Sequence, residues 1–291
     1  MGGIVIHLTY LKRLWGDYVC LLYMGKYKTI LYTLCWNEMD ILPFVIDYWK
    51  EMGLDKVVVY DNESDDGSRE FLEQYDWIEV RIRKTNGEKD NDAHKKLKDS
   101  CWKEAVNEYD FIIVCDIDEV LYFPQGIEKV LDRLEGSYNV LGVKNYALVE
   151  DYKPERKEGL LMHQMGLRWY LQPSNHKAQY KCVGMAKFVL FRNDAHIRWS
   201  VGQHIAYGDN LKALFVDESE CISLHIYAGF GVDYKIARNK MQRDRLSLNN
   251  KNKGYSSHYK KSEDEMRREY RECQEKSVDI NEVIRQKKSH P

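Results

Sequence analysis

The stretch from Phe111 to Glu119 constrains the fold more than any other part of this 291-residue chain. Its first five residues are apolar and predict a buried strand, and Asp116 and Asp118 follow where that strand should end. Successive strand residues point to opposite faces, so we expect the two aspartates to share a face and Glu119 to point away from Asp118. Carboxylates at such an edge suit a divalent cation that also contacts phosphates, although solvated acids that cap a strand would show the same pattern.

Strands and helices alternate over the first half of the chain. Apolar runs at 29–34, 56–60 and 78–82 predict strands, and the segments between them, at about 41–52, 69–75 and 92–108, predict helices. This alternation indicates an α/β fold with a doubly wound, mostly parallel sheet, whose ligands bind beyond the carboxyl ends of the strands. Polar residues that follow the strands should therefore share one rim: Asn37, Glu38, Asp61, Asp65, Asp116 and Asp118.

The second half of the chain is less regular. Strands are predicted at 140–149 and 187–191, a basic helix at 232–246, and a long excursion without clear period at 151–181. The tail at 262–288 has a helical pattern of mixed charges, which is typical of a solvated face. We divide the chain into an N-terminal segment without an assigned role (1–27), a main domain (28–260, with halves 28–123 and 124–260) and a C-terminal charged helical extension (261–291).

Composition excludes several classes of protein. The net charge of -2 leaves no basic excess for binding nucleic acid. Seven scattered cysteines without a C-x-x-C pair argue against a zinc knuckle and a disulfide framework, and they fit a reducing compartment. We find no apolar run near the ~20 residues of a membrane span and no convincing signal peptide. We expect a cytoplasmic protein, and the basic helix could attract it to the inner face of a membrane.

Three motifs together resemble a known family. They are Asn37-Glu38, the segment Asp61-Asn62-x-Ser64-x-Asp66-Gly67-Ser68, and the run Cys115-Asp116-Ile117-Asp118-Glu119. As a set they resemble the family 2-like glycosyltransferases of the GT-A fold, in the bacterial branch with "DNxSxDG" and "DxDE" motifs. The likeness covers about residues 28–260 and continues at Lys187, Gly202-x-His204, Leu224-His225, Arg245-x-Ser247 and His258-Tyr259. The chain departs from the pattern at Val120, where the branch often has Phe, and it lacks a clear "ED" pair.

The resemblance implies a metal-dependent transfer of sugar from a nucleotide-diphosphate donor to a glycan or lipid-linked acceptor, with inversion, in surface polysaccharide synthesis. It implies Mn²⁺ or Mg²⁺ held by Asp116, Asp118 and His225. Three alternatives remain. Asn62 could serve in capping and turn hydrogen bonds, His225 could be a core histidine, and the arginines could lie on a solvated helix face. The residues implied for donor binding are Asn37, Glu38, Asp61, Asn62, Asp66, Asp116, Arg238 and Arg245.

The catalytic base has several candidates. An inverting displacement needs a carboxylate or imidazole that takes the acceptor proton, and Asp151, Glu150, Asp209 and His204 are candidates that the sequence does not rank. Two other functions fit parts of the pattern. Haloacid-dehalogenase-type phosphatases also carry an Asp-x-Asp after an apolar strand, but early in the chain, whereas here it follows three strands. A non-catalytic nucleotide-sugar-binding protein on the same fold is the other alternative.

Overall fold

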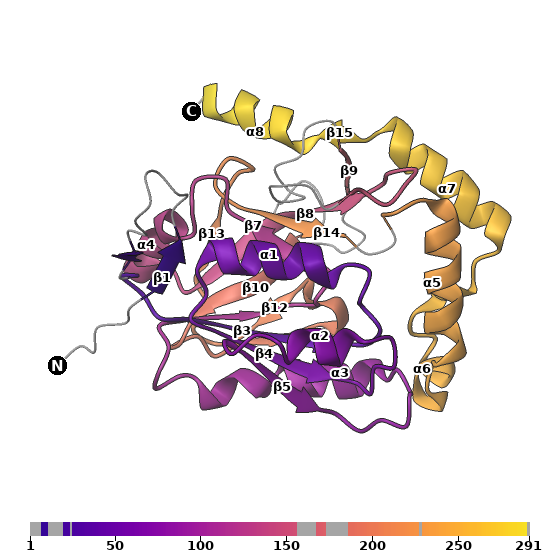
Figure 1. The fold of residues 1–291 in the computed structure, drawn as a ribbon, viewed down its shortest axis with the longest axis horizontal. Helices are drawn as coiled ribbons and strands as arrows, with labels where there is room; N and C mark the ends of the chain where they lie inside the picture. The colour runs from indigo at the N-terminus through magenta and orange to yellow at the C-terminus, as the bar shows by residue number, and fades with distance from the viewer. Residues whose placement is uncertain are drawn as a thin grey trace.

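The structure, a computed structural model, describes residues 7–10, 20–23, 25–155, 167–172, 186–226 and 229–289. A sheet of 11 strands forms the centre of this described part, with the order β15-β9-β8-β10-β6-β3-β4-β5 along its main path (Figure 1). Helix α1 (Leu42–Met52) packs on one face of the sheet, while α3 (Asn91–Lys98) and the turn after it pack on the other. The predicted α/β fold with helices on both faces is therefore confirmed.

The first half of the sheet is parallel, as predicted. Strand β3 (Thr29–Cys35) pairs in parallel with β4 (Lys56–Asp61) and β6 (Phe111–Val114), and β4 pairs in parallel with β5 (Ile78–Ile82). The strands β3, β4 and β6 are almost continuous runs of apolar residues because both faces of the sheet are covered. Their carboxyl ends consequently meet at one edge, which brings the polar residues after β3, β4 and β6 together.

The second half of the sheet is mixed. Strand β10 (Ala186–Arg192) runs antiparallel to both β6 and β8 (Val140–Leu148). Strand β14 (Ile222–His225) is parallel to β8 and antiparallel to β7 (Glu119–Tyr122), and β13 (Ala213–Phe215) is parallel to β8. The strands predicted at 140–149 and 187–191 are therefore confirmed. Strand β14 reaches the carboxyl edge of the parallel half, where it delivers His225.

Two predictions about elements are wrong. The helix expected at 92–108 ends at Lys98, and a short 3-10 turn at Cys101–Glu104 follows. The excursion at 151–181 contains strand β9 (Arg168–Leu171), which pairs with β8; residues 156–166 and 173–181 of the excursion lie outside the described part. The remaining short elements are α2 (Ser68–Leu72), α4 (Glu128–Ser137) and two antiparallel pairs, β1 (His7–Tyr10) with β2 (Cys20–Tyr23) and β11 (Arg198–Trp199) with β12 (Ala206–Tyr207).

The C-terminal helices wrap around one side of the sheet (Figure 1). They are α5 (Val232–Asp244), α6 (Leu248–Lys253), α7 (Glu263–Glu275) and α8 (Ile280–Ser289). Between α7 and α8, strand β15 (Val278–Asp279) pairs with β9 at the edge of the sheet. Met266 and Tyr270 of α7 are buried, and Ile280 and Ile284 of α8 belong to the main core. The solvated face expected for this tail is thus only its outer side.

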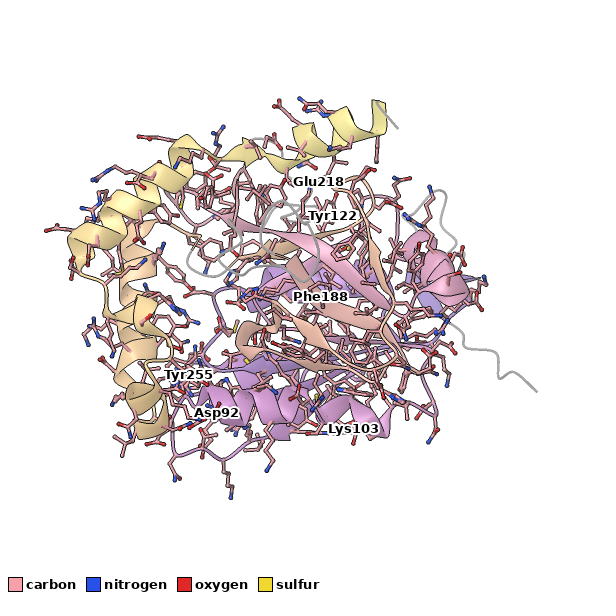
Figure 2. The ribbon with its side chains drawn as sticks, turned by 180° about the vertical axis from the view of Figure 1, so that it is seen from behind. Asp92, Lys103, Tyr122, Phe188, Glu218 and Tyr255 are labelled. Carbon is pink, nitrogen blue, oxygen red and sulfur yellow. The ribbon has the colours of Figure 1, made fainter. Side chains whose placement is uncertain are left out.

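Helix α6 is joined to the start of α3. Asn249 and Lys253 both contact the carboxylate of Asp92 at the start of α3. Figure 2 shows Asp92 beside Tyr255 at this junction. The carboxylate of Asp90 caps α3 and accepts hydrogen bonds from Ser247 and Asn249. The C-terminal helices therefore form a wall that is fixed at both ends, by α6 to α3 and by β15 to the sheet.

Expectations drawn from composition agree with the described residues. Among the described cysteines, Cys35 and Cys115 are free thiols buried in the core, as the apolar pattern around them predicts. None of the described helices combines the length and the apolar character needed to cross a bilayer.

Replacing Ile280 with Ala tests whether the C-terminal helix belongs to the core. Ile280 is fully buried, so the truncation should lower the free energy of unfolding by about 2–5 kcal/mol. Leu248→Ala is the control, because Leu248 is 70% exposed and its truncation should change stability by about 0.5 kcal/mol or less. Chemical denaturation measures both. Equal effects of the two substitutions would mean that α8 is not integral to the core.

Candidate active site

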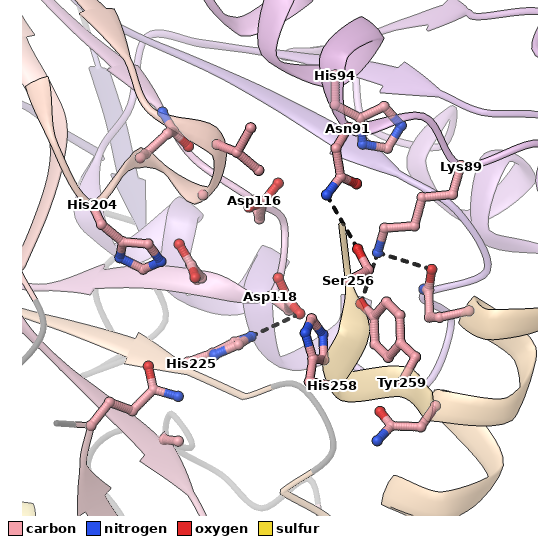
Figure 3. A pocket seen from close by; sticks show the side chains of 18 of the residues that line it. Lys89, Asn91, His94, Asp116, Asp118, His204, His225, Ser256, His258 and Tyr259 are labelled. Atoms are coloured by element: carbon pink, nitrogen blue, oxygen red, sulfur yellow. Dashed lines mark hydrogen bonds and ion pairs between the residues drawn. The ribbon is translucent and has the colours of Figure 1, made fainter. Parts of the chain in front are cut away.

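A cavity of about 1000 Å³ lies at the carboxyl ends of the parallel strands. The ends of β3 and β6 form its floor, and α5, α7 and the segment between α6 and α7 form its wall. Asp116 and Asp118 lie at its centre with His204, His225 and His258 around them (Figure 3). The rim predicted from the sequence is therefore a real cavity, closed on one side by residues from the last quarter of the chain.

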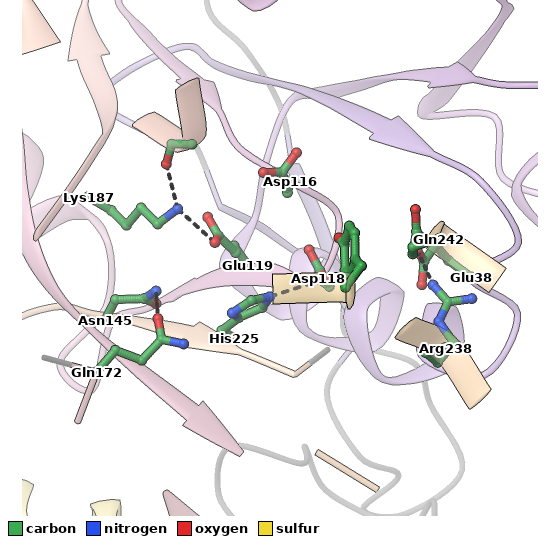
Figure 4. A network of polar contacts seen from close by, with 12 residues as sticks. Glu38, Asp116, Asp118, Glu119, Asn145, Gln172, Lys187, His225, Arg238 and Gln242 are labelled. Carbon is green, nitrogen blue, oxygen red and sulfur yellow. Dashed lines mark hydrogen bonds and ion pairs between the residues drawn. The ribbon is translucent and has the colours of Figure 1, made fainter. Parts of the chain in front are cut away.

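The two aspartates lie on a turn and not on a strand. Strand β6 ends at Val114 and β7 begins at Glu119, whose N–H donates to the carbonyl of Asp116 at 3.0 Å. Both aspartates line the cavity, so the prediction that they face the same side is correct. The reason given for it, the alternation of side chains along a strand, is wrong. Glu119, expected to point away, lines the same cavity, where its carboxylate lies 2.8 Å from the ammonium of Lys187 (Figure 4).

Asp116 is held by a buried network that starts in α3. The ammonium of Lys98 lies 2.6 Å from the Asp116 carboxylate and donates to Oε1 of Gln203 at 2.9 Å. Nε2 of Gln203 donates in turn to the carbonyl of Val114 at the end of β6. Gln203 has a left-handed backbone (φ 59°), which costs about 1–2 kcal/mol outside glycine and is found where surrounding contacts impose it. Desolvation would raise the pKa of Asp116, but Lys98 and Lys187 hold it below its usual value.

Asp118 is paired with His225 from β14. Nε2 of His225 lies 3.2 Å from Oδ2 of Asp118, and the N–H of Ile226 donates to the Asp118 carbonyl at 2.8 Å. Burial would raise the pKa of Asp118, but His225 lowers it below the usual value. Burial would lower the pKa of His225, but Asp118 raises it above the usual value. Without a metal, the protein thus favours an ionised Asp118 beside a protonated His225. A bound cation would take the place of the proton on His225.

The donor set fits a divalent cation that keeps ligands from substrate and water. Asp116, Asp118 and His225 line the cavity, and oxygen and nitrogen ligands of this kind suit Mn²⁺ and Mg²⁺. In the described ranges, no three His, Cys, Asp or Glu side chains are arranged so that they could hold a metal ion by themselves. Asp118 with His225 could therefore supply two ligands, and Asp116 a third group nearby, with the rest left to the ligand.

The side of the cavity next to β3 carries polar groups without partners. We call it the β3 side; it is lined by Trp36, Asn62, Lys89 and Arg245. The guanidinium of Arg245 lies 3.5 Å from the centre of the Trp36 ring, and burial lowers its pKa to about 10, helped by Arg238. Asn62 is 2% exposed, and neither atom of its amide has a partner in the described part of the chain. Buried amides are normally satisfied, so a ligand is the natural partner of Asn62.

Glu38 and Arg238 form a buried ion pair behind the β3 side. Nη2 of Arg238 lies 2.6 Å from Oε1 of Glu38, and Nη1 donates to the carbonyl of Asn37 at 2.6 Å. Burial raises the pKa of Glu38 to about 8, although Arg238 opposes this shift. Glu38 lines the cavity and Arg238 does not. These two contacts of the Arg238 guanidinium hold α5 against the end of β3, whereas the resemblance implies a contact with the donor.

Three further residues expected at the donor lie outside the cavity lining. The amide of Asn37 exchanges two hydrogen bonds with Asp65, and the carboxylate of Asp66 accepts from the N–H groups of Met39 and Ser68. The carboxylate of Asp61 is fully buried and accepts from the N–H of Ser64. These contacts match the alternative of turn and capping hydrogen bonds, which shape the corners after β3 and β4.

Of the candidate bases, His204 is the one placed at the cavity. The Asp151 carboxylate is exposed and accepts from Gln274 at 2.7 Å, and the Asp209 side chain is 83% exposed and lies 3.1 Å from His196. Glu150 is buried and accepts from the N–H of Arg168. We therefore no longer consider Asp151, Asp209 or Glu150 as bases for chemistry in this cavity.

Several cavity residues were missed in the sequence. Lys98 and Gln203 sit in segments whose patterns suggest a helix face and a loop, and nothing local marks them as partners of Asp116. His258, which the sequence analysis names with Tyr259, lies on the segment between α6 and α7, and its ring centre is 4.0 Å from that of Tyr259. Burial, with help from Lys89, lowers the pKa of His258 to about 4. The wall therefore presents a neutral imidazole to the cavity at pH 7.

Residues 32–289 match the family model described as glycosyltransferase family 92. The chain belongs to glycosyltransferase family 92. A family 92 protein of Ricinus communis is 28% identical to it over 105 residues, which are 35% of this chain and 17% of that protein. The match thus spans less than a fifth of the relative. Membership confirms the prediction that the protein is a glycosyltransferase. The family is family 92, whereas the motifs suggest a family 2-like enzyme.

Solved structures with related folds are distant from this family 92 protein. Staphylococcus aureus TarS (residues 1–349) gives a TM-score of 0.40 with 12% identity, over 74% of this chain and 65% of that one. The same protein in complex with UDP-GlcNAc gives 0.35 with 12% identity, over 74% and 66%. HddC from Yersinia pseudotuberculosis gives 0.28 with 11% identity, over 40% and 59%.

Acidification should destabilise the protein through His258. Its pKa is about 4 when folded and about 6.5 when unfolded, so the unfolded chain binds more protons between these values and stability falls as the pH drops. From pH 7 to pH 5 the wild type should lose stability relative to His258→Gln, by up to about 1 kcal/mol because solvent screens the exposed part of the ring, measured by denaturation at each pH. His196→Gln, at a histidine outside the cavity, should follow the wild type. A wild type and a His258→Gln variant with parallel pH curves would contradict a lowered pKa of His258.

Proposed function

We propose that this protein is a metal-dependent glycosyltransferase that moves a sugar from a nucleotide-diphosphate donor to a glycan or lipid-linked acceptor. The observation that carries the proposal is the convergence of Asp116, Asp118 and His225 at the carboxyl edge of the sheet in a family 92 chain. A cavity of about 1000 Å³ has room for a donor and part of an acceptor. The motif resemblance further supports inversion, surface polysaccharide synthesis and work at the cytoplasmic face of a membrane.

The centre of the cavity is suited to a diphosphate leaving group. A bound Mn²⁺ or Mg²⁺ would neutralise the negative charge that develops on that group. Asp118 and His225 would hold the ion, with Asp116 beside them. Lys98 keeps Asp116 ionised and fixed in direction, so the carboxylate needs little rearrangement when a cation arrives.

The β3 side is suited to the nucleoside part of the donor. The Asn62 amide offers one donor and one acceptor at a buried position, and the indole of Trp36 with the stacked guanidinium of Arg245 forms a flat surface next to it. Nη2 of Arg245 is buried without a partner in the described residues, so it can donate to a ligand. These are the residues that we assign to donor binding on the β3 side, with Glu38 behind them.

His204 is our candidate for the base. It lines the cavity from the segment after β11, next to Gly202, whose carbonyl accepts from the ammonium of Lys187. An imidazole there could take the proton of an acceptor hydroxyl as the bond to the sugar forms. The carbonyl contact fixes the backbone two residues before His204.

Asp118→Asn should abolish metal-dependent donor binding and transfer. In a thermal-shift panel of nucleotide sugars with and without Mn²⁺, the true donor should raise the melting temperature of the wild type only with metal, by mass action. Loss of a carboxylate that holds the cation should reduce transfer at least about 100-fold. Asp209→Asn, at an exposed carboxylate outside the cavity, should leave both unchanged.

The panel also separates the alternatives. Transfer that persists in the presence of a chelator would contradict the metal role, and donor binding without any turnover would favour a non-catalytic nucleotide-sugar-binding protein. A flat panel with turnover of phosphate esters would favour the phosphatase.

His204→Gln should lower kcat for transfer by about 10²–10⁴ while the donor still binds with wild-type affinity. Steady-state kinetics and donor titration measure the two effects. His196→Gln should keep wild-type kcat. An unchanged kcat, or weakened donor binding in its place, would remove His204 as the base.

A further inference from the structure

The cavity extends from the catalytic centre to a second side formed by β9, α5 and α7. We call this the α7 side; it is lined by Tyr170, Lys235, Glu269, Tyr270 and Glu272. Strand β9 lies at the opposite end of the sheet path from β3 and β4, with the end of β6 between them. If the donor occupies the β3 side, the α7 side is left for the acceptor. The inference below rests on that part of the proposed function.

Lys235 on the α7 side lies without a counter-ion among the described residues. Its ammonium lies 5.4 Å from the centre of the Tyr270 ring, and no described carboxylate is within salt-bridge distance. The carboxylate of Glu269 on the same side is already neutralised, because the ammonium of Lys261 lies 2.7 Å from each of its oxygens. Lys235, Lys261 and Lys276 line the cavity here with Glu269 and Glu272, so the charges of these five side chains leave a net positive charge.

The position of Lys235 is costly for the protein. Burial lowers the pKa of its side chain, and Lys261 lowers it further while Glu269 and Cys273 act in the opposite direction. Burying an ammonium without a carboxylate partner destabilises the folded state, so a site of this kind is expected where a ligand supplies the missing charge. The charges that act on Lys235 come from α7 and Lys261 and not from Asp116 or Asp118. That separation argues for the acceptor and against the donor diphosphate.

We propose that the α7 side recognises an acceptor sugar that carries an anionic group, a carboxylate or a phosphate, and that Lys235 binds this group. Tyr170, on β9, adds an aromatic ring of the kind on which sugar rings pack, and Gln172 beside it has its carbonyl engaged by Asn145 at 2.7 Å, so its N–H groups remain for a ligand (Figure 4). The anionic group would avoid the apolar surface at Leu148, the last residue of β8, and Val149 after it, and Lys235 would orient the sugar.

The test compares sugars that differ in a single group. Binding of 4-nitrophenyl β-glucuronide, 4-nitrophenyl β-glucoside and 4-nitrophenyl β-glucoside 6-phosphate to the full chain is measured by calorimetry, with and without the nucleotide selected by the donor panel. The glucuronide or the phosphate should bind at least about tenfold more tightly than the glucoside, because a hydrogen bond to a charged group contributes about 1.5–3 kcal/mol. The better of the two identifies a carboxylated or a phosphorylated acceptor.

Substitution then assigns the effect to Lys235. Lys235→Met should remove the preference for the anionic sugar and leave glucoside and nucleotide binding unchanged, and Lys235→Arg should retain part of the preference. Lys240→Met is the matched control on the same helix, because Lys240 is exposed and paired with Asp244 outside the cavity. If Lys235→Met does not fold, the comparison of charged and neutral sugars on the wild type still tests the inference.

Three outcomes would overturn the inference. They are equal binding of charged and neutral sugars to the wild type, equal weakening of both by Lys235→Met, and weakened nucleotide binding in that variant, which would place Lys235 at the donor diphosphate. Failure of the proposed function looks different, since it would appear as a flat donor panel whatever the sugars do.

Discussion

Three acidic side chains lie within four positions at the end of one strand, with Asp118 and Glu119 largely buried, and the rest of the structure depends on neutralising them. Lys98 pairs with Asp116, His225 with Asp118 and Lys187 with Glu119. The three partners come from α3, β14 and β10, which reach this point from both halves of the chain. A buried carboxylate without a partner costs several kcal/mol, so the three pairs select the topology in which these elements meet.

The three ion pairs also differ in how easily a ligand could take the place of one partner. Lys187 is almost fully buried and holds both Glu119 and the carbonyl of Gly202, so this pair is structural. The His225–Asp118 contact is longer, at 3.2 Å, and involves a base that can lose its proton. In the proposed function, a divalent cation would compete for the same two groups and would offer more charge than the proton that it displaces from His225. The two firmer ion pairs would then surround the proposed cation position, and the most exchangeable pair would lie at it.

How much the sequence predicts depends on whether a residue's partner is local. The parallel strands were predictable because their apolar runs and polar corners are local patterns, and the rim that holds Asp116 and Asp118 follows from them. The family resemblance led to His204 and His225 in the second half. Lys98 and Gln203 were not predictable, since their role depends on contacts across the fold. Asn37 and Asp66 lie outside the cavity lining, which was not predictable for the same reason: the sequence shows that they form a corner but not which way their side chains turn.

The placement of α5 connects the two sides of the cavity. Arg238 fixes this helix to the end of β3 through Glu38 and Asn37, while Lys235, one turn earlier, faces α7. Both ends of the C-terminal wall are anchored, by the Asp90 and Asp92 contacts to α6 and by the β15–β9 pairing. A ligand on the β3 side that moves Glu38 must therefore act on the same rigid helix that carries Lys235. Donor and acceptor affinities should consequently be coupled, because one helix supplies charge to both sides of the cavity.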